Sequence, residues 1–208
     1  MKKKIIVSGP GLTRSGYGEQ CRFALRALRA HEDRFDIYFN PLNWGNTSWI
    51  ADNDEERLWF DSLIRRTMGY NQAKGKYDYS LQVTIPNEWQ NMATINIGYT
   101  AGIETDRVAP EWIQAANSMN KIIVVSNHSK EVYEKTSYLA KNDATGETVN
   151  LVCNTPIEVV NFPARNVQPT KIDLELSTKF NFLTVAQWSP RKNLKNTFRW
   201  FVEEFFDQ

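Results

Sequence analysis

Short apolar runs alternate along this chain with stretches in which apolar residues recur at helical spacing. Residues 3–8 form a continuous apolar run, which is typical of a strand that is covered on both faces in a parallel sheet. A glycine-rich turn follows. From Gly18 onward, Phe23, Leu25 and Leu28 stand among arginines at helical spacing, so the pattern predicts an amphipathic helix that ends near residue 31.

The same alternation continues through the first 160 residues. Strands are predicted at residues 35–39, 79–85, 94–99, 121–126 and 156–160, and helices at residues 55–68, from residue 110, and at residues 129–139. Pro110 suits the first turn of its helix. Repeated strand–helix alternation predicts an α/β fold with a doubly wound parallel Rossmann-like sheet.

Residues 161–178 interrupt this rhythm with two prolines and few adjacent apolar residues. A strand at residues 180–186 and a helix at residues 194–206 are predicted after the interruption. One strand and one helix cannot bury a core, so we expect this segment to fold back, to pair between chains in a homo-oligomer, or to be disordered. The predicted organisation is a domain at residues 1–165, a linker at 166–179 and the truncated start of a second domain at 180–208.

Composition narrows the classes of function. The chain has 25 Lys and Arg against 24 Asp and Glu, which removes the simplest electrostatic case for nucleic acid. The apolar run at residues 5–7 is too short for a signal peptide or a membrane span, so we expect a cytoplasmic protein. Cys21 and Cys153 lie too far apart for a metal motif or a disulfide framework, and we expect no metal.

The first candidate site is the glycine-rich turn GPGLTRSGYG at residues 9–18. It stands between the first strand and its helix, where open α/β sheets bind ligands. The amides at a helix N-terminus accept phosphate or hydroxyl groups, whereas the alternative is a flexible turn. Arg14 stands where the dinucleotide fingerprint requires its third glycine. The candidate substrate-binding residues of this turn are Gly11, Ser15, Gly16, Tyr17 and Gly18.

The second candidate site follows the strand at residues 94–99. Glu104, Asp106 and Arg107 stand at the carboxyl end of this strand, and Trp112, KIIVV and SNHSK follow. This succession resembles the retaining GT-B glycosyltransferases of the large family that includes sucrose synthases and bacterial mannosyl- and glucosyltransferases. In that family an E…W…IIVVS…S(K/R) stretch closes the acceptor domain.

A second segment, FLTVAQWSPRKN at residues 182–193, looks like the beginning of the donor domain in the same family. The resemblance assigns Lys192 to the donor diphosphate. The usual Gly-Arg pair is replaced by Ala186-Gln187, and Arg191 is the candidate substitute for the arginine. The later acidic motif of the family would lie beyond Gln208, so the resemblance implies that this fragment is inactive alone.

The resemblance also implies a reaction. A hexosyl group passes from a nucleoside-diphosphate sugar to a hydroxyl of a carbohydrate or lipid-linked acceptor, with retention and without a metal or cofactor. Family members often carry a histidine after the strand at residues 94–99, and Glu104 is our catalytic candidate for its place. Asp106 and Arg107 are substrate-binding candidates. Neither His31 nor His128 is assigned to chemistry, because each is explained as a helix-end or first-turn residue.

Two other classes of function remain open. A nucleotide-binding oxidoreductase domain would need the dinucleotide fingerprint and an acidic residue after the second strand, where Asn40 stands. A non-catalytic carbohydrate-binding module would need only a sugar site. Trp89, which follows the strand at residues 79–85, is a candidate to stack on a sugar ring.

Overall fold

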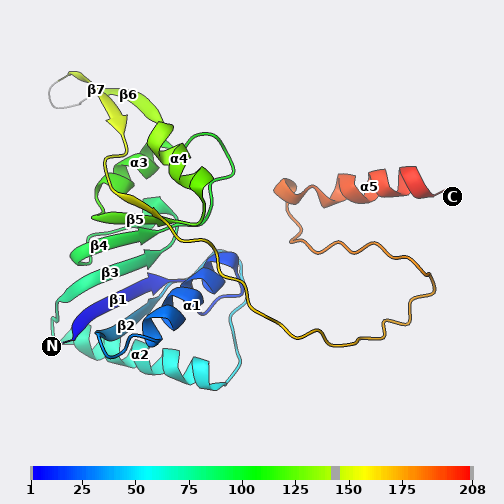
Figure 1. Ribbon diagram of the computed structural model, residues 1–208, viewed down its shortest axis with the longest axis horizontal. Helices are drawn as coiled ribbons and strands as arrows, with labels where there is room; N and C mark the ends of the chain where they lie inside the picture. The colour runs from blue at the N-terminus through cyan, green and yellow to red at the C-terminus, as the bar shows by residue number, and fades with distance from the viewer. Residues whose placement is uncertain (1, 142–145, 207–208) are drawn as a thin grey trace. The chain divides into compact units, whose positions relative to one another are not determined.

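The computed structural model describes residues 2–141 and 146–206. The chain divides into two compact units, with Ala164 the last residue of the first and Arg165 the first residue of the second. The first unit contains the sheet and the helices that flank it (Figure 1).

The first unit is built on a six-stranded parallel sheet with the order β2-β1-β3-β4-β5-β8. This confirms the predicted Rossmann-like α/β fold. The strands are β1 (Lys3–Gly9), β2 (Phe35–Pro41), β3 (Tyr77–Val83), β4 (Ala93–Tyr99), β5 (Lys121–Val124) and β8 (Ile157–Val159). The helices are α1 (Gly16–Arg29), α2 (Glu55–Gln72), α3 (Pro110–Asn117) and α4 (Asn127–Lys135), with a 3₁₀ turn η1 (Pro86–Glu88).

Strand β1 lies between β2 and β3, so the direction of winding reverses at this strand. In open α/β sheets such a reversal separates the loops at the carboxyl edge and leaves a crevice in which ligands bind. The loop that follows β1 and the loop that follows β3 border this point.

Two large apolar clusters hold the sheet and helices together. One cluster joins β1, β2 and β3 to α1 and α2, and includes the fully buried side chains of Val7, Leu25 and Phe39. The other joins β5 and β8 to α3 and α4, around Ile122 and Tyr133. The continuous apolar runs of the sequence therefore correspond to strands covered by other elements, as their pattern predicts.

The prediction of a helix at residues 129–139 was wrong over its last part. Helix α4 ends at Lys135, because Thr136 adopts an extended backbone and its hydroxyl donates to the carbonyl of Val132 over 2.6 Å. The chain then forms β6 (Ser137–Lys141), which pairs antiparallel with β7 (Thr148–Val152). Figure 1 shows this hairpin beyond α3 and α4.

The second unit contains a 3₁₀ turn η2 (Pro190–Lys192) and the helix α5 (Leu194–Phe205). The predicted helix is confirmed, but the prediction of a strand at residues 180–186 was wrong. A strand needs a neighbour for its N–H and C=O groups, and no other strand is present among the described residues of this unit. Instead, the ring of Phe182 contacts those of Phe201 and Phe205 at centroid distances of 5.0 and 5.6 Å.

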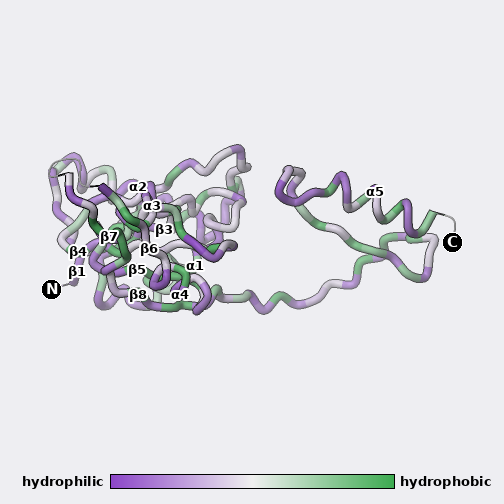
Figure 2. The backbone as a smooth tube through the Cα atoms, turned by 90° about the horizontal axis from the view of Figure 1, so that it is seen from above, coloured by the Kyte–Doolittle hydropathy of each residue, from purple (hydrophilic) through white to green (hydrophobic). Residues whose placement is uncertain are grey.

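Figure 2 shows hydrophobic and hydrophilic stretches alternating along α5, as expected of an amphipathic helix. Among the helices of the described residues, none is both long and apolar enough to cross a membrane.

Candidate functional site

Backbone hydrogen bonds hold the glycine-rich turn after β1 in one conformation. The backbone N–H of Thr13 donates to the carbonyl of Pro10 over 2.8 Å, and Thr13 forms an antiparallel bridge with Trp49. The backbone N–H of Ile50 donates to the carbonyl of Leu12 over 2.8 Å. These bonds argue against the alternative of a flexible turn, because residues on both sides of Thr13 are tied to a second segment of backbone.

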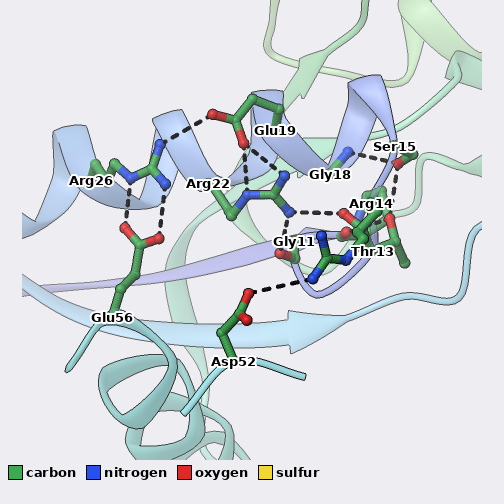
Figure 3. Close-up of polar contacts among 11 residues, drawn as sticks. Gly11, Thr13, Arg14, Ser15, Gly18, Glu19, Arg22, Arg26, Asp52 and Glu56 are labelled. Atoms are coloured by element: carbon green, nitrogen blue, oxygen red, sulfur yellow. Dashed lines mark hydrogen bonds and ion pairs between the residues drawn. The ribbon is translucent and has the colours of Figure 1, made fainter. Parts of the chain in front are cut away.

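A buried arginine fixes the same turn against α1. Arg22 is 7% exposed, and its Nη1 donates to the carbonyls of Gly11 and Thr13, each over 2.8 Å. Its Nε donates to the carboxylate of Glu19 over 2.8 Å, and this carboxylate balances the positive charge of Arg22 (Figure 3). The turn is therefore preorganised, because its carbonyls have partners without any ligand.

The four candidate residues at the start of α1 differ in their exposure. Ser15 caps the helix and accepts a hydrogen bond from the backbone N–H of Gly18 over 2.9 Å. Gly18 is buried, and a Cβ there would lie 2.3 Å from the carbonyl oxygen of Thr13. Gly16 is exposed, and a Cβ there would meet no atom within 4 Å. Gly18 therefore serves packing, whereas Gly16 leaves an open approach to the positive end of the helix dipole.

Gly11 is also buried, and its lack of a side chain leaves space for neighbouring side chains. A Cβ on Gly11 would lie 2.9 Å from the ring of Phe39 and 3.2 Å from the Sγ of Cys21. Burial raises the pKa of the Cys21 thiol to about 12, so this thiol stays protonated beneath the turn. Gly11 thus shapes the turn from inside, whereas Gly16 is exposed and Ser15 and Tyr17 are half-buried at its surface.

Tyr17 joins the turn after β1 to the loop after β4. Its hydroxyl lies 2.9 Å from the Oγ1 of Thr100 and accepts a hydrogen bond from the backbone N–H of Ala101 over 3.1 Å. Its ring packs on Trp44 at a centroid distance of 4.6 Å. Burial raises the pKa of Tyr17, and the charge of Glu88 adds to the rise. The two candidate segments therefore lie side by side at the carboxyl edge of the sheet.

The loop after β4 lines a pocket of about 460 Å³. Glu104, Arg107 and Trp112 are among its lining residues, whereas Asp106 is exposed on the same loop. The backbone N–H of Ile103 donates to the Oγ of Ser129 over 3.2 Å, which attaches the loop to the first turn of α4. A carboxylate, a guanidinium and an indole on one pocket suit a ligand with several hydroxyl groups and an apolar ring face.

Glu88 is a functional candidate that our sequence analysis missed. It ends η1, directly after β3, and so borders the point where the winding of the sheet reverses. Burial raises the pKa of its carboxyl group, and its charge acts on Tyr17. The signal in the sequence was a carboxylate two residues after Pro86, the residue that follows a predicted strand at its carboxyl end.

Trp89, by contrast, does not offer a stacking face. It is 7% exposed and covers Gly98, where a Cβ would lie 2.6 Å from the indole ring. The candidate role of Trp89 in stacking on a sugar was therefore wrong, because the missing side chain of Gly98 lets the indole pack into the core. His128 lies on α4, with its Nε2 3.2 Å from the carbonyl oxygen of Thr105.

The two candidate donor-binding residues belong to the second unit. Arg191 and Lys192 are consecutive on η2, and both are exposed. Asn193 ends this turn in a left-handed conformation with φ 51°, and the helix α5 begins at the next residue. The two cations therefore stand just before the N-terminus of a helix.

Among the described residues, no group of three His, Cys, Asp or Glu side chains is placed to hold a metal ion. Comparisons of this chain with models of protein families, with curated proteins and with solved structures find no significant match. The arguments about function therefore rest on the residues and their geometry.

Proposed function

We propose that this chain carries the acceptor-binding part of a retaining glycosyltransferase with a GT-B fold. The enzyme transfers a hexosyl group from a nucleoside-diphosphate sugar to a hydroxyl of a carbohydrate or lipid-linked acceptor. The observation that carries the proposal is the bond from Tyr17 to Thr100 and Ala101, which brings the glycine-rich turn and the Glu104 loop to one edge of the sheet. The resemblance of these two segments to the family supplies the reaction.

Each group has a role that its surroundings support. The open backbone at Gly16 and the first-turn amides of α1 receive oxygen atoms of the acceptor. Glu104 and Arg107 bind hydroxyl groups in the pocket after β4, and Glu104 is the catalytic candidate. Tyr17 fixes the turn after β1 to the loop after β4. The raised pKa of Glu88 makes it a second carboxyl group suited to proton exchange with a hydroxyl.

The donor contacts follow from the family resemblance. Lys192 and Arg191 bind the diphosphate of the sugar nucleotide and neutralise the charge that develops as it departs. Both side chains are exposed cations on one short turn, which suits a doubly charged group. The reaction needs no metal in this proposal, because the two cations take over the neutralisation of charge.

The structure also bears on the oxidoreductase alternative. Asn40, at the position of the acidic residue that would bind a nucleotide ribose, donates through Nδ2 to the Oγ of Ser8 over 3.0 Å. Gly18 and Gly11 are both closed off by packing, so the backbone approach that a pyrophosphate requires is restricted to Gly16. The lack of a carboxylate at residue 40 disfavours a dinucleotide site.

Binding to the first unit is the direct test. We expect titration with monosaccharides, disaccharides and their lipid-linked forms to shift the backbone NMR signals of Ser15, Gly16, Tyr17 and Gly102. Gly16→Leu fills the open approach and weakens binding by about tenfold or more. Gly69→Leu is the matched control. A Cβ at Gly69 also meets nothing within 4 Å, but Gly69 lies on α2, away from the turn. Tight binding of NADH without any sugar effect would favour the oxidoreductase instead.

The two carboxylates are separated by a second comparison. Glu104→Gln and Glu88→Gln keep shape and remove charge. Both are tested for sugar binding to this chain and, because the proposal gives residues 1–208 alone no activity, for transfer from a panel of sugar nucleotides in a chain extended through the donor domain. We expect Glu104→Gln to lower both. A loss caused only by Glu88→Gln would move the catalytic role to Glu88, and no loss with either variant would contradict the site.

A further inference from the structure

An apolar groove of about 290 Å³ lies between α1 and the segment that follows β8. Its floor and one wall come from α1 and from β3, β4 and β5, through Phe23, Ala27, Leu28, Leu81, Tyr99 and Ile123. The other wall is the segment 160–163, in which the ring of Phe162 packs edge-on against Phe23 at a centroid distance of 5.8 Å. Figure 1 shows this segment passing beside α1.

The groove ends at the carboxyl edge of the sheet, where the proposed acceptor site lies. Tyr99 is the last residue of β4, and the Nδ2 of Asn161 donates over 3.2 Å to the carbonyl of Val125, just beyond the end of β5. Thr100, which follows Tyr99, lies 2.9 Å from the hydroxyl of Tyr17 through its Oγ1. The groove therefore leads to the same edge as the glycine-rich turn and the loop after β4.

A buried amide stands at this end of the groove. Gln20 lies one turn before Ala24 on the stripe of α1 that also includes Ala27. It is 0% exposed, and neither polar atom of its side chain has a hydrogen-bond partner among the described residues. Burial raises the pKa of Tyr99, and the Gln20 amide beside it offsets part of this rise. Because buried polar groups are normally satisfied, this end of the groove calls for a polar atom.

The walls of the groove specify the chemistry of its occupant. Among the described residues that line it, none is Asp, Glu, Lys or Arg, so a charged group would be buried there without a counter-charge. Its volume is at the lower limit of the about 300–1,000 Å³ that small-molecule pockets have, and a helix, about 10 Å across, is too wide for it. A single hydrocarbon chain with a polar group at one end meets both requirements.

We propose that the acceptor is a lipid-linked sugar whose hydrocarbon chain lies in this groove, with the sugar at the carboxyl edge. The chain covers Phe23, Ala27 and Ile123, and the polar linkage to the sugar lies beside Gln20. The inference rests on the proposed function, because it chooses between the carbohydrate and the lipid-linked acceptors of the same site. Apolar surface far from the reacting hydroxyl then contributes to the binding of the acceptor.

Glycosides that differ only in chain length test the proposal. Methyl, hexyl and octyl glycosides of glucose, galactose and mannose are titrated into the chain below the concentrations at which they form micelles. We expect the octyl glycoside of at least one sugar to bind about tenfold more tightly than its hexyl form, because each buried methylene adds a factor of about three to four. The backbone NMR signals of Ala24 and Ile123 shift with the octyl form and not with the methyl form, whereas that of Gly16 shifts with both.

Two variants of the groove test where the chain lies. Ala27→Trp narrows the groove, and Val160→Asp puts a charge in its wall; both positions are exposed at the rim, so the fold accepts the changes. We expect each variant to remove the dependence on chain length, so that the octyl form binds no more tightly than the methyl form. Ala30→Trp and Val167→Asp make the same changes at exposed positions outside the groove, and both keep the dependence.

The outcomes separate this inference from the proposed function. An affinity that is independent of chain length, or a dependence that survives both Ala27→Trp and Val160→Asp, would overturn the inference, while a shift at Gly16 would leave the proposed function standing. Binding of 1-octanol as tight as that of every octyl glycoside would also overturn it, because the chain would then bind without its sugar. No shift at Gly16 with any glycoside would contradict the proposed function, and the inference with it.

Discussion

Arg22 is a buried cation whose partners include two backbone carbonyls. Replacing it by Met keeps most of the side-chain volume but leaves the carbonyls of Gly11 and Thr13 and the carboxylate of Glu19 without this donor. We expect Arg22→Met to lower the free energy of unfolding of the first unit by about 2–4 kcal/mol, because unsatisfied buried polar groups are costly. Urea unfolding followed by circular dichroism measures the change.

The control for this substitution is Arg29→Met on the same helix. Arg29 pairs with Glu55, whose side chain is 88% exposed, and a surface ion pair contributes below about 1 kcal/mol. If the two substitutions had equal effects, Arg22 would not be holding the turn.

Cys21 gives the protein a dependence on alkaline pH. Burial raises the pKa of its thiol from an ordinary 9.0 to about 12, so above pH 9 the unfolded chain loses a proton that the folded chain keeps. The stability contribution is complete below pH 9 and falls as the pH rises toward 12, by up to about 1.4 kcal/mol per pH unit. Unfolding free energies between pH 8 and 10.5 should therefore fall less steeply for Cys21→Ala than for the original chain. Parallel slopes would contradict the assignment.

At the scale of single elements, the start of α1 depends on two glycines in opposite ways. Gly18→Ala would bring a Cβ to 2.3 Å from the carbonyl oxygen of Thr13, and the backbone must move. We expect a loss of stability of about 2 kcal/mol or more. Gly16→Ala has open space and should gain about 0.5 kcal/mol by restricting the unfolded chain. Thermal unfolding of both variants checks the pair, and equal changes would contradict it.

The side chain of Asn117 on α3 holds the end of the β6–β7 hairpin through two hydrogen bonds. Asn117 donates through Nδ2 to the carbonyl of Val152 and accepts through Oδ1 from the backbone N–H of Asn154, each over 2.8 Å. Asn117→Ala removes both bonds, so we expect amide exchange in β7 to become about tenfold faster while exchange in β1 stays unchanged. Ser118→Ala is the control, because its hydroxyl donates to the carbonyl of Ala115 in the same helix and not to the hairpin.

The elements that the sequence predicted well are those whose partners are local or whose pattern is unbroken. The apolar run of β1 and the periodic arginines of α1 fall within one or two residues of the observed bounds. The hairpin was missed because Tyr138 and Leu139 continue the helical spacing of α4. The strand is favoured by its antiparallel pairing with β7 and by the bond of the Tyr138 hydroxyl to the carbonyl of Val108, neither of which a local pattern reveals. The strand at residues 180–186 failed because strand formation depends on a neighbour that no local pattern reveals.

The candidate site shows the same division between local and distant information. Its place after β1 and β4 followed from the strand pattern alone. The roles of single residues did not follow from this pattern. Trp89 packs over Gly98 and is therefore buried away from the site, whereas Glu88 lies close enough to Tyr17 for its charge to act there. Both depend on side chains from distant parts of the chain.

At the scale of the whole molecule, the stability of the first unit rests on its own core. Apart from Leu194, every buried apolar side chain of the described residues belongs to the first unit, and so do the apolar clusters that join its strands and helices. Deleting residues 165–208 should therefore change the free energy of unfolding of this unit by less than about 0.5 kcal/mol. Urea unfolding of both chains, followed by amide exchange of residues in β1 and β3, measures this difference. A loss above about 2 kcal/mol would mean that residues 165–208 complete the core of the first unit, since only a buried apolar contact or a buried polar network is worth that much.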